Sequence, residues 1–311
     1  MNLVWKMALN SGRDDFKKDK SKCDEARKFC FANGWTGIGW QIEGIDDGTT
    51  NAELYGDYLA HSPYGRSAKS AHNALAHRMK DGDFVWCRTR DNIYWLGRAD
   101  GPWTYRCVGD FALYDLFQVR ACSWLRVGPS DLVPGPVKNA FAGRGSAISQ
   151  FRSESESSLL MSASIWNGKT RTDISLPRSG HANLPLSAIG HDDLEDIVLF
   201  FIQAELKWYI SVSSAKRSTP LTECVLRHMD GRRGYVQIKS GHSKMTTSLV
   251  KAPTDVDIFF LFDPSENEGS IIGKVHRIGA AELRAFIEKQ PYLLPPYMEA
   301  LRYQHKNDGS D

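Results

Sequence analysis

Three polar residues in two neighbouring strand-like segments have the types and spacing to hold a divalent metal ion. Glu223 begins the first segment, while Gln237 and Lys239 lie near the end of the second, in YVQIKSG. Asp230-Gly231 between the segments predicts a hairpin turn, which would bring these side chains to one edge of a sheet. Carboxylate and amide oxygens bind Mg²⁺, and a lysine beside the ion can act on the attacking water or the phosphate. This pattern indicates hydrolysis of a phosphodiester.

An acidic helix is predicted just upstream of these segments. The sequence DDLEDIVLFFIQAEL (192–206) carries an apolar stripe at helical spacing, and its acidic start complements the helix dipole. One carboxylate of this helix could complete the metal site. Glu195 is the first candidate, and Asp196 is the alternative.

Together these segments resemble a known family. Glu223, Gln237-Ile238-Lys239 and the order helix, strand, Glu strand, Q-x-K strand over about 190–265 resemble the PD-(D/E)XK restriction-endonuclease superfamily, in its Q-x-K form. The resemblance implies an αβββ core with a mixed sheet and DNA cleavage that depends on Mg²⁺ or Mn²⁺. It also implies that Glu195, Glu223 and Gln237 bind the metal and that Lys239 is catalytic. Gln237 departs from the commoner carboxylate and adds no charge, so the ion would be held less tightly.

Polar residues on either side of the Glu and Q-x-K strands could contact DNA phosphates, although a plain polar loop explains them equally. They are Ser214, Lys216, Arg217, His242 and Lys244.

The first half of the chain is rich in tryptophan, glycine and short strand-like segments. Candidate strands at 37–43, 83–89, 92–99 and 116–127 are separated by turn residues, which predicts a small β-barrel or curled sheet. A helix is predicted at 66–80, where alanine, leucine and methionine share one face.

The phrases GWTGIGW (34–40) and DGDFVWCRTRDNIYWLGRADGPWTY (81–105) resemble the PUA/EVE/ASCH-like pseudobarrels. That resemblance implies recognition of a nucleotide, in some relatives a flipped modified base stacked on aromatic rings. For each tryptophan taken alone, packing in a core is the competing interpretation. The candidate base-contacting residues are Trp35, Trp40, Asp83, Trp86, Arg98 and Trp103.

The expected organisation is therefore a mixed α/β (α+β) protein of two domains. Residues 1–150 would form the β-barrel that selects DNA, 151–190 a linker or irregular segment, and 191–311 the nuclease-like domain. For the middle segment three alternatives stay open: a linker, a dimer arm or part of the core.

Composition limits the remaining possibilities. The formal charge is +2, so nucleic-acid binding must come from local basic clusters. Six cysteines without C-x-x-C spacing indicate reduced thiols and a cytoplasmic protein. The longest apolar run is far shorter than the roughly 18 residues of a membrane span, so no membrane partner is expected.

The leading hypothesis is a metal-dependent endonuclease of a restriction-modification or antiviral defence system. Its substrate would be double-stranded DNA, which could carry modified bases. Cleavage of both strands would require a homodimer. One alternative is a catalytically inactive reader of modified DNA or RNA, with activity lost through Gln237. Another is an interaction protein without a nucleic-acid role, since the chain lacks a strong overall basic charge.

Overall fold

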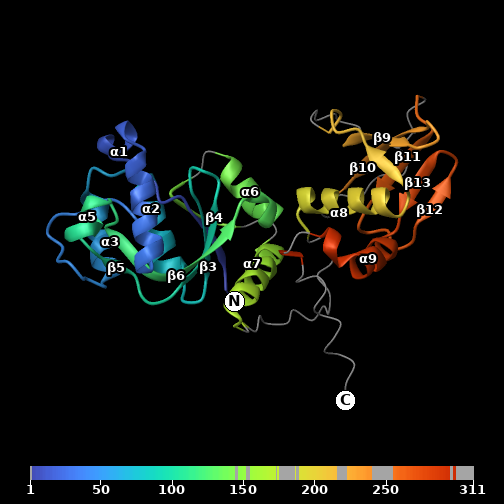
Figure 1. Ribbon diagram of the computed structural model, residues 1–311. Coiled ribbons are helices and arrows are strands. Elements are labelled where there is room, and N and C mark those ends of the chain that lie inside the picture. The colour runs from blue at the N-terminus through green and yellow to red at the C-terminus, as the bar shows by residue number, and fades with distance from the viewer. Residues whose placement is uncertain are drawn as a thin grey trace, which may run out of the picture. The chain divides into compact units, whose positions relative to one another are not determined.

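The chain divides into two compact units, residues 1–177 and 178–311 (Figure 1). The computed structural model describes residues 2–143, 146–151, 155–172, 174, 186, 189–215, 223–239, 255–294 and 297–298. Each unit is built on its own mixed sheet, and the two are described separately.

The sheet of the first unit runs in the order β2-β6-β4-β3-β1-β7, with β5 paired to β6. Only β1 and β3 pair in parallel. The long strand β6 bends the sheet, because its first part pairs with β2 and β5 and its remainder with β4. The result is a curled half-barrel, which matches the curled sheet that the sequence predicted as one of two forms and is not the closed small β-barrel. Its strands are β1 Val4–Met7, β2 Trp35–Ile38, β3 Phe84–Arg88, β4 Tyr94–Ala99, β5 Thr104–Tyr105, β6 Gln118–Gly128 and β7 Ile148–Gln150.

Short helices connect these strands. The Asn51 side chain accepts a hydrogen bond from the Leu54 amide at 3.0 Å, which caps the start of α3. Gly34, at φ 72°, ends α2 in a left-handed conformation that suits glycine and leads directly into β2. The helices are α1 Asp14–Lys18, α2 Ser21–Asn33, α3 Ala52–His61, α4 Arg66–His72, α5 Gly109–Leu113, α6 Gly135–Ala142 and α7 Ser155–Thr170, with a π-helical turn Asn73–Arg78 and a 3₁₀ turn Ser130–Leu132.

Helix α7 changes the predicted domain boundary. Its Ser162 hydroxyl accepts a hydrogen bond from the Trp86 indole at 2.9 Å, and Trp166 packs against Phe84 of β3 with ring centroids 6.1 Å apart. Residues 155–170, expected within a linker or irregular segment, are therefore a helix of the first unit. Both serines and large apolar residues of α7 are buried, so this helix has no clear polar face.

The second unit holds a six-stranded sheet in the order β12-β13-β11-β10-β9-β8. Strands β8, β9 and β10 form an antiparallel meander, and β11 then pairs with β10 in parallel. The predicted hairpin joins β9 to β10, with Gly231 at φ 92°. The strands are β8 Trp208–Ile210, β9 Cys224–His228, β10 Arg233–Ile238, β11 Ile258–Phe262, β12 Ser270–Ile272 and β13 Val275–Ile278.

Two helices pack together on this second sheet, as Figure 1 shows for α8 (His191–Ala204) and α9 (Ala280–Lys289). Phe201 and Phe286 meet edge to face between them at 5.6 Å. A 3₁₀ turn, Pro291–Leu293, follows α9. In the part of the chain that the structure describes, no helix has the length and apolar character needed to cross a bilayer.

Candidate metal centre

Helix α8 places one carboxylate at the edge of the second sheet. Leu194, Ile197 and Val198 are fully buried and fix the orientation of the helix on the sheet. That orientation leaves Glu195 half-buried, whereas the adjacent Asp196 is exposed. Between the two candidates of the sequence, Glu195 is thus the residue that faces the strands.

Glu223 lies immediately before β9, next to the end of β10. The Glu223 amide donates to the Val236 carbonyl at 2.9 Å. The antiparallel pairing of β9 with β10 ends one residue away, where Cys224 lies opposite Val236. Glu223 therefore lies alongside the Val236–Gln237 peptide. Its carboxylate approaches Glu195 from this position.

A histidine completes the cluster. One ligand atom each of His191, Glu195 and Glu223 lie within 4.8 Å of one another. The His191 Nε2 atom is 3.2 Å from Glu195 Oε1, one helical turn away. The sequence reading overlooked His191, although its i, i+4 spacing from Glu195 on the predicted helix was a usable signal.

The carboxylates of Glu195 and Glu223 repel each other when both are ionised. Burial and the charge of Glu223 raise the pKa of Glu195 to about 8. At neutral pH the pair is therefore held together by a shared proton, which a divalent cation could replace. Burial and then the charges of Glu195 and Glu223 raise the pKa of the neighbouring Cys224 thiol to about 12, so this thiol is uncharged at neutral pH.

The donor set fits a divalent ion. Two carboxylates and one imidazole supply three of the about six ligands that Mg²⁺ or Mn²⁺ takes, leaving positions for water and phosphate oxygens. An imidazole ligand favours Mn²⁺ over Mg²⁺, which prefers oxygen alone. A metal at this position would rest on His191, Glu195 and Glu223.

Gln237 lies near the end of β10, beside Glu223 in the ladder, and Lys239 follows that strand. Both side chains are half-buried and alternate with the buried Val236 and Ile238, so they share one face of β10. The Lys239 amide donates to the Phe262 carbonyl at 3.0 Å, which extends the pairing with β11. Within the described ranges, no hydrogen bond or ion pair joins either side chain to Glu195 or Glu223.

The predicted phosphate contacts divide into two groups. Ser214 has a local structural role, since its hydroxyl accepts from the Val225 amide at 2.8 Å and donates to the Ser211 carbonyl at 2.6 Å. The other predicted residues lie outside the described residues. They are Lys216, Arg217, His242 and Lys244.

In the first unit, three of the predicted base-contacting residues are buried and make contacts inside the unit. Trp86 is fully buried against Ser162 of α7, and Trp103 is buried against Tyr55 of α3, with ring centroids 5.3 Å apart. Asp83 is 1% exposed and accepts hydrogen bonds from the Trp5 indole, among others. These side chains are not available to stack on or read a base in this structure.

The remaining three are accessible in part. Trp35 and Trp40 are half-buried, and each backbone carbonyl accepts a side-chain hydrogen bond, from Trp124 and Tyr55 respectively. Arg98 is half-buried, and its Nε is a buried atom without a hydrogen-bond partner among the described residues. Of the six predicted base-contacting residues, these three are the ones whose side chains are partly accessible, so the cage of four tryptophans does not form.

Comparison with known protein families gave one match. Residues 5–139 are similar to a family model described as a domain of unknown function (DUF8426). Comparison with curated proteins and with solved structures gave no match. The similarity therefore lies within the first unit and does not extend to the Glu195–Glu223 cluster.

Proposed function

We propose that this protein is a divalent-metal-dependent DNA endonuclease of the restriction or phage-defence type. The observation that carries the proposal is the Glu195–Glu223 pair, two carboxylates from different elements held together at the edge of a mixed sheet. Such a pair is electrostatically unfavourable unless a proton or a cation lies between its members. His191 provides a third ligand at the same place.

The surrounding topology supports the same proposal. Helix α8, the meander β8–β9–β10 and the parallel strand β11 follow the order expected of the αβββ restriction-endonuclease-like core. Glu223 immediately precedes the second strand of the meander, Gln237 lies near the end of the third, and Lys239 follows it. Both segments reach the same end of the sheet, as the Glu223–Val236 hydrogen bond requires.

In the proposed cleavage of a phosphodiester, the metal ligands and Lys239 would have different roles. A bound Mg²⁺ or Mn²⁺ would polarise the phosphate and lower the pKa of the attacking water. Glu195 and Glu223 would hold the ion, with His191 as an additional ligand and Gln237 as a neutral one. Lys239 would orient the water or offset the charge that develops on the phosphate, once its side chain turns toward the bound DNA. Cleavage of both strands would use a homodimer.

The inactive reader is the second candidate. It is favoured by the missing charge at position 237, where Gln237 replaces the commoner carboxylate. If the site has decayed through this substitution, Gln237→Glu should restore metal-dependent cutting to an inactive protein. The first unit would then be the functional part, binding modified DNA or RNA.

Cleavage assays test the proposal. Plasmid and modified phage DNA are incubated with Mg²⁺, Mn²⁺ or EDTA, and the wild type is compared with Glu223→Gln and Lys239→Ala. We expect cutting that needs the metal and that both variants lose. Glu205→Gln is the matched control, because Glu205 is an exposed carboxylate at the far end of α8.

Three outcomes decide between the candidates. Metal-dependent cutting that survives Lys239→Ala would contradict the catalytic role of the lysine. DNA binding without cutting on any substrate would favour the reader, and competition between RNA and duplex DNA at matched salt would identify its ligand. If the wild-type protein neither bound nor cut any of these nucleic acids, both candidate functions would be contradicted.

A further inference from the structure

The first unit contains a pocket of about 540 Å³ whose charged lining residues are all cationic. It lies among α1, α2, β1, β3 and the end of α6, and Phe16 and Phe141 form part of its wall. No aspartate or glutamate lines it within the described part of the chain. The six cations are Lys6, Lys17, Lys20, Arg27, Arg88 and Arg90.

Carboxylates outside the pocket neutralise only half of this set. Lys17 pairs with Asp14 at 2.9 Å, while Arg27 and Arg90 share Asp24 at 2.7 and 3.6 Å. For Lys6, Lys20 and Arg88, the described residues include no carboxylate partner.

Lys6 and Arg88 are the centre of this uncompensated charge. The Lys6 ammonium donates to the Ala140 carbonyl at 2.7 Å, and the Arg88 guanidinium donates to the Phe141 carbonyl at 3.0 Å. Lys6 is only 6% exposed, and burial followed by the charge of Arg88 lowers its pKa. Placing two cations together in a partly dry site is costly unless an anion joins them.

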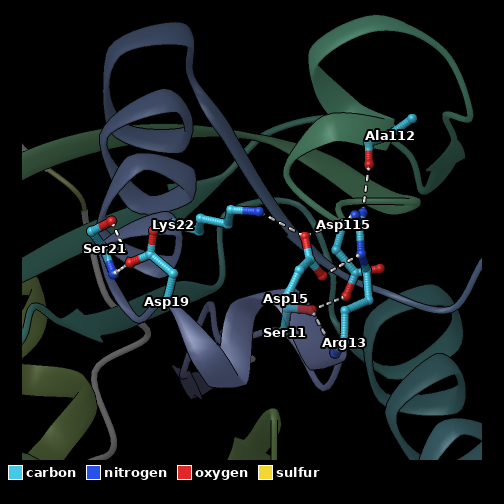
Figure 2. A network of polar contacts seen from close by, with 8 residues as sticks. All are labelled: Ser11, Arg13, Asp15, Asp19, Ser21, Lys22, Ala112 and Asp115. Carbon is cyan, nitrogen blue, oxygen red and sulfur yellow. Dashed lines mark hydrogen bonds and ion pairs between the residues drawn. The ribbon is translucent and has the colours of Figure 1, made fainter.

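In a neighbouring network of polar contacts, by contrast, the charges of the cations are neutralised by a carboxylate. In Figure 2 Arg13 and Lys22 both reach Asp15, at 3.1 and 3.0 Å, and Arg13 also donates to the Ala112 carbonyl. Ser11 bonds to Asp115 in the same view. These contacts fix α1 and α2, which carry the pocket cations Lys17 and Arg27, and Lys20 lies between the two helices.

The chemistry of the wall indicates which anion would fit. Lys6 and Arg88 lie over the Phe141 ring at 5.1 and 5.5 Å, and Arg13 lies over Phe16 at 5.2 Å. With these ring faces taken by cations, the pocket offers charge and hydrogen bonds rather than a platform for stacking a base. A phosphate group meets that description.

We infer that this pocket binds a phosphate of the nucleic-acid backbone, with Lys6, Arg88 and Lys20 as its principal contacts. The pocket deepens the proposed function by placing the DNA contact of the first unit outside the tryptophans. The choice of DNA rests on that proposal, whereas the pocket is argued from the first unit alone. A free nucleotide offers the same phosphate chemistry and is distinguished by the test.

The test is binding of a labelled duplex, followed by fluorescence anisotropy in EDTA between about 50 and 200 mM salt. Lys20→Gln/Arg88→Gln removes two uncompensated pocket cations. We expect weaker binding and a slope of log K against log salt that falls by about one, since the pocket neutralises one phosphate and each neutralised phosphate contributes roughly 0.9. Lys18→Gln/Lys28→Gln is the matched control, because both lysines are exposed and outside the pocket.

Further variants and ligands make each outcome decisive. Arg88→Lys keeps the charge and should keep the slope, and Lys20→Gln alone, at an exposed position, should lower the slope by less than the double variant does. A pocket-specific loss on duplex DNA supports the backbone site, and a loss confined to a 5′-mononucleotide identifies a nucleotide site instead. Equal losses in pocket and control variants, or none in either, would overturn the inference. Because EDTA prevents metal-dependent cleavage, this result is independent of the nuclease proposal.

Discussion

Glu195 of α8 and Glu223 before β9 approach each other as two half-buried carboxylates. Burial and then the charge of Glu223 raise the pKa of Glu195 to about 8, so Glu195 holds a proton at neutral pH. A metal ion would have to displace that proton. Because the proton and the metal compete for Glu195, both the metal affinity and the stability of the second unit should depend on pH.

The first prediction concerns metal affinity and pH. Binding of Mn²⁺ requires ionised Glu195, so the apparent affinity should rise between pH 6 and 8, by up to about tenfold per pH unit for one displaced proton. Glu195→Gln should bind more weakly and lose most of this dependence. Calorimetric titration in buffers of different ionisation enthalpy measures both affinity and released protons. An affinity that does not change with pH would contradict the shared-proton account.

The second prediction concerns stability without metal. The pKa of Glu195 is higher in the folded protein than its ordinary value of 4.5. The folded state therefore binds the proton more tightly, and the second unit should lose stability as pH rises from about 4.5 toward 8. Glu195→Gln should be more stable than the wild type at pH 8, by about 1 to 3 kcal/mol after allowing for solvent screening, and similar to it at pH 4.5.

Trp208 allows this measurement on one unit. It is the one tryptophan in residues 178–311, so its signal in a fluorotryptophan-labelled protein reports urea unfolding of the second unit. Glu205→Gln, at an exposed carboxylate, is the control and should leave the pH dependence unchanged. A wild-type stability that rises over the same range would show that the sign is wrong.

The third prediction concerns the support of α8. Tyr297 donates from its hydroxyl to Asp193 at 2.7 Å, and Asp193 is fully buried. Tyr297→Phe removes one donor from a buried carboxylate and should cost about 1 to 3 kcal/mol of unfolding free energy. Tyr209→Phe, at an exposed tyrosine of the same unit, provides the comparison. Equal stability of the two variants would mean that the Asp193 contact contributes little.

The fourth prediction separates core tryptophans from binding ones. Trp86→Phe removes a buried indole and its bond to Ser162, so it should lower stability by about 1 to 3 kcal/mol. DNA affinity of the folded variant should remain unchanged. Trp40→Phe, at a half-buried ring, provides the comparison in anisotropy titrations. A selective loss of DNA binding by a well-folded Trp86→Phe protein would restore Trp86 as a base-contacting candidate.

The local elements were the part that sequence reasoning could reach. The acidic amphipathic helix, the hairpin at Asp230-Gly231 and the alternating strand with Gln237 and Lys239 all occur where their patterns predicted them. These patterns depend on residue spacing within one element, which is visible in the sequence. Helix α7 was missed because a helix buried on several sides has no amphipathic period to detect.

The sequence by itself determined which acids, amides and cations the chain possesses and on which elements they lie. Tertiary structure decided which of them meet. It joined His191 and Glu195 to Glu223, placed Trp86 in a core, and gathered Lys6, Arg88 and Lys20 from separate elements around one pocket. The physical reason is that burial and electrostatic energy depend on distances between elements, and packing of the whole unit sets those distances.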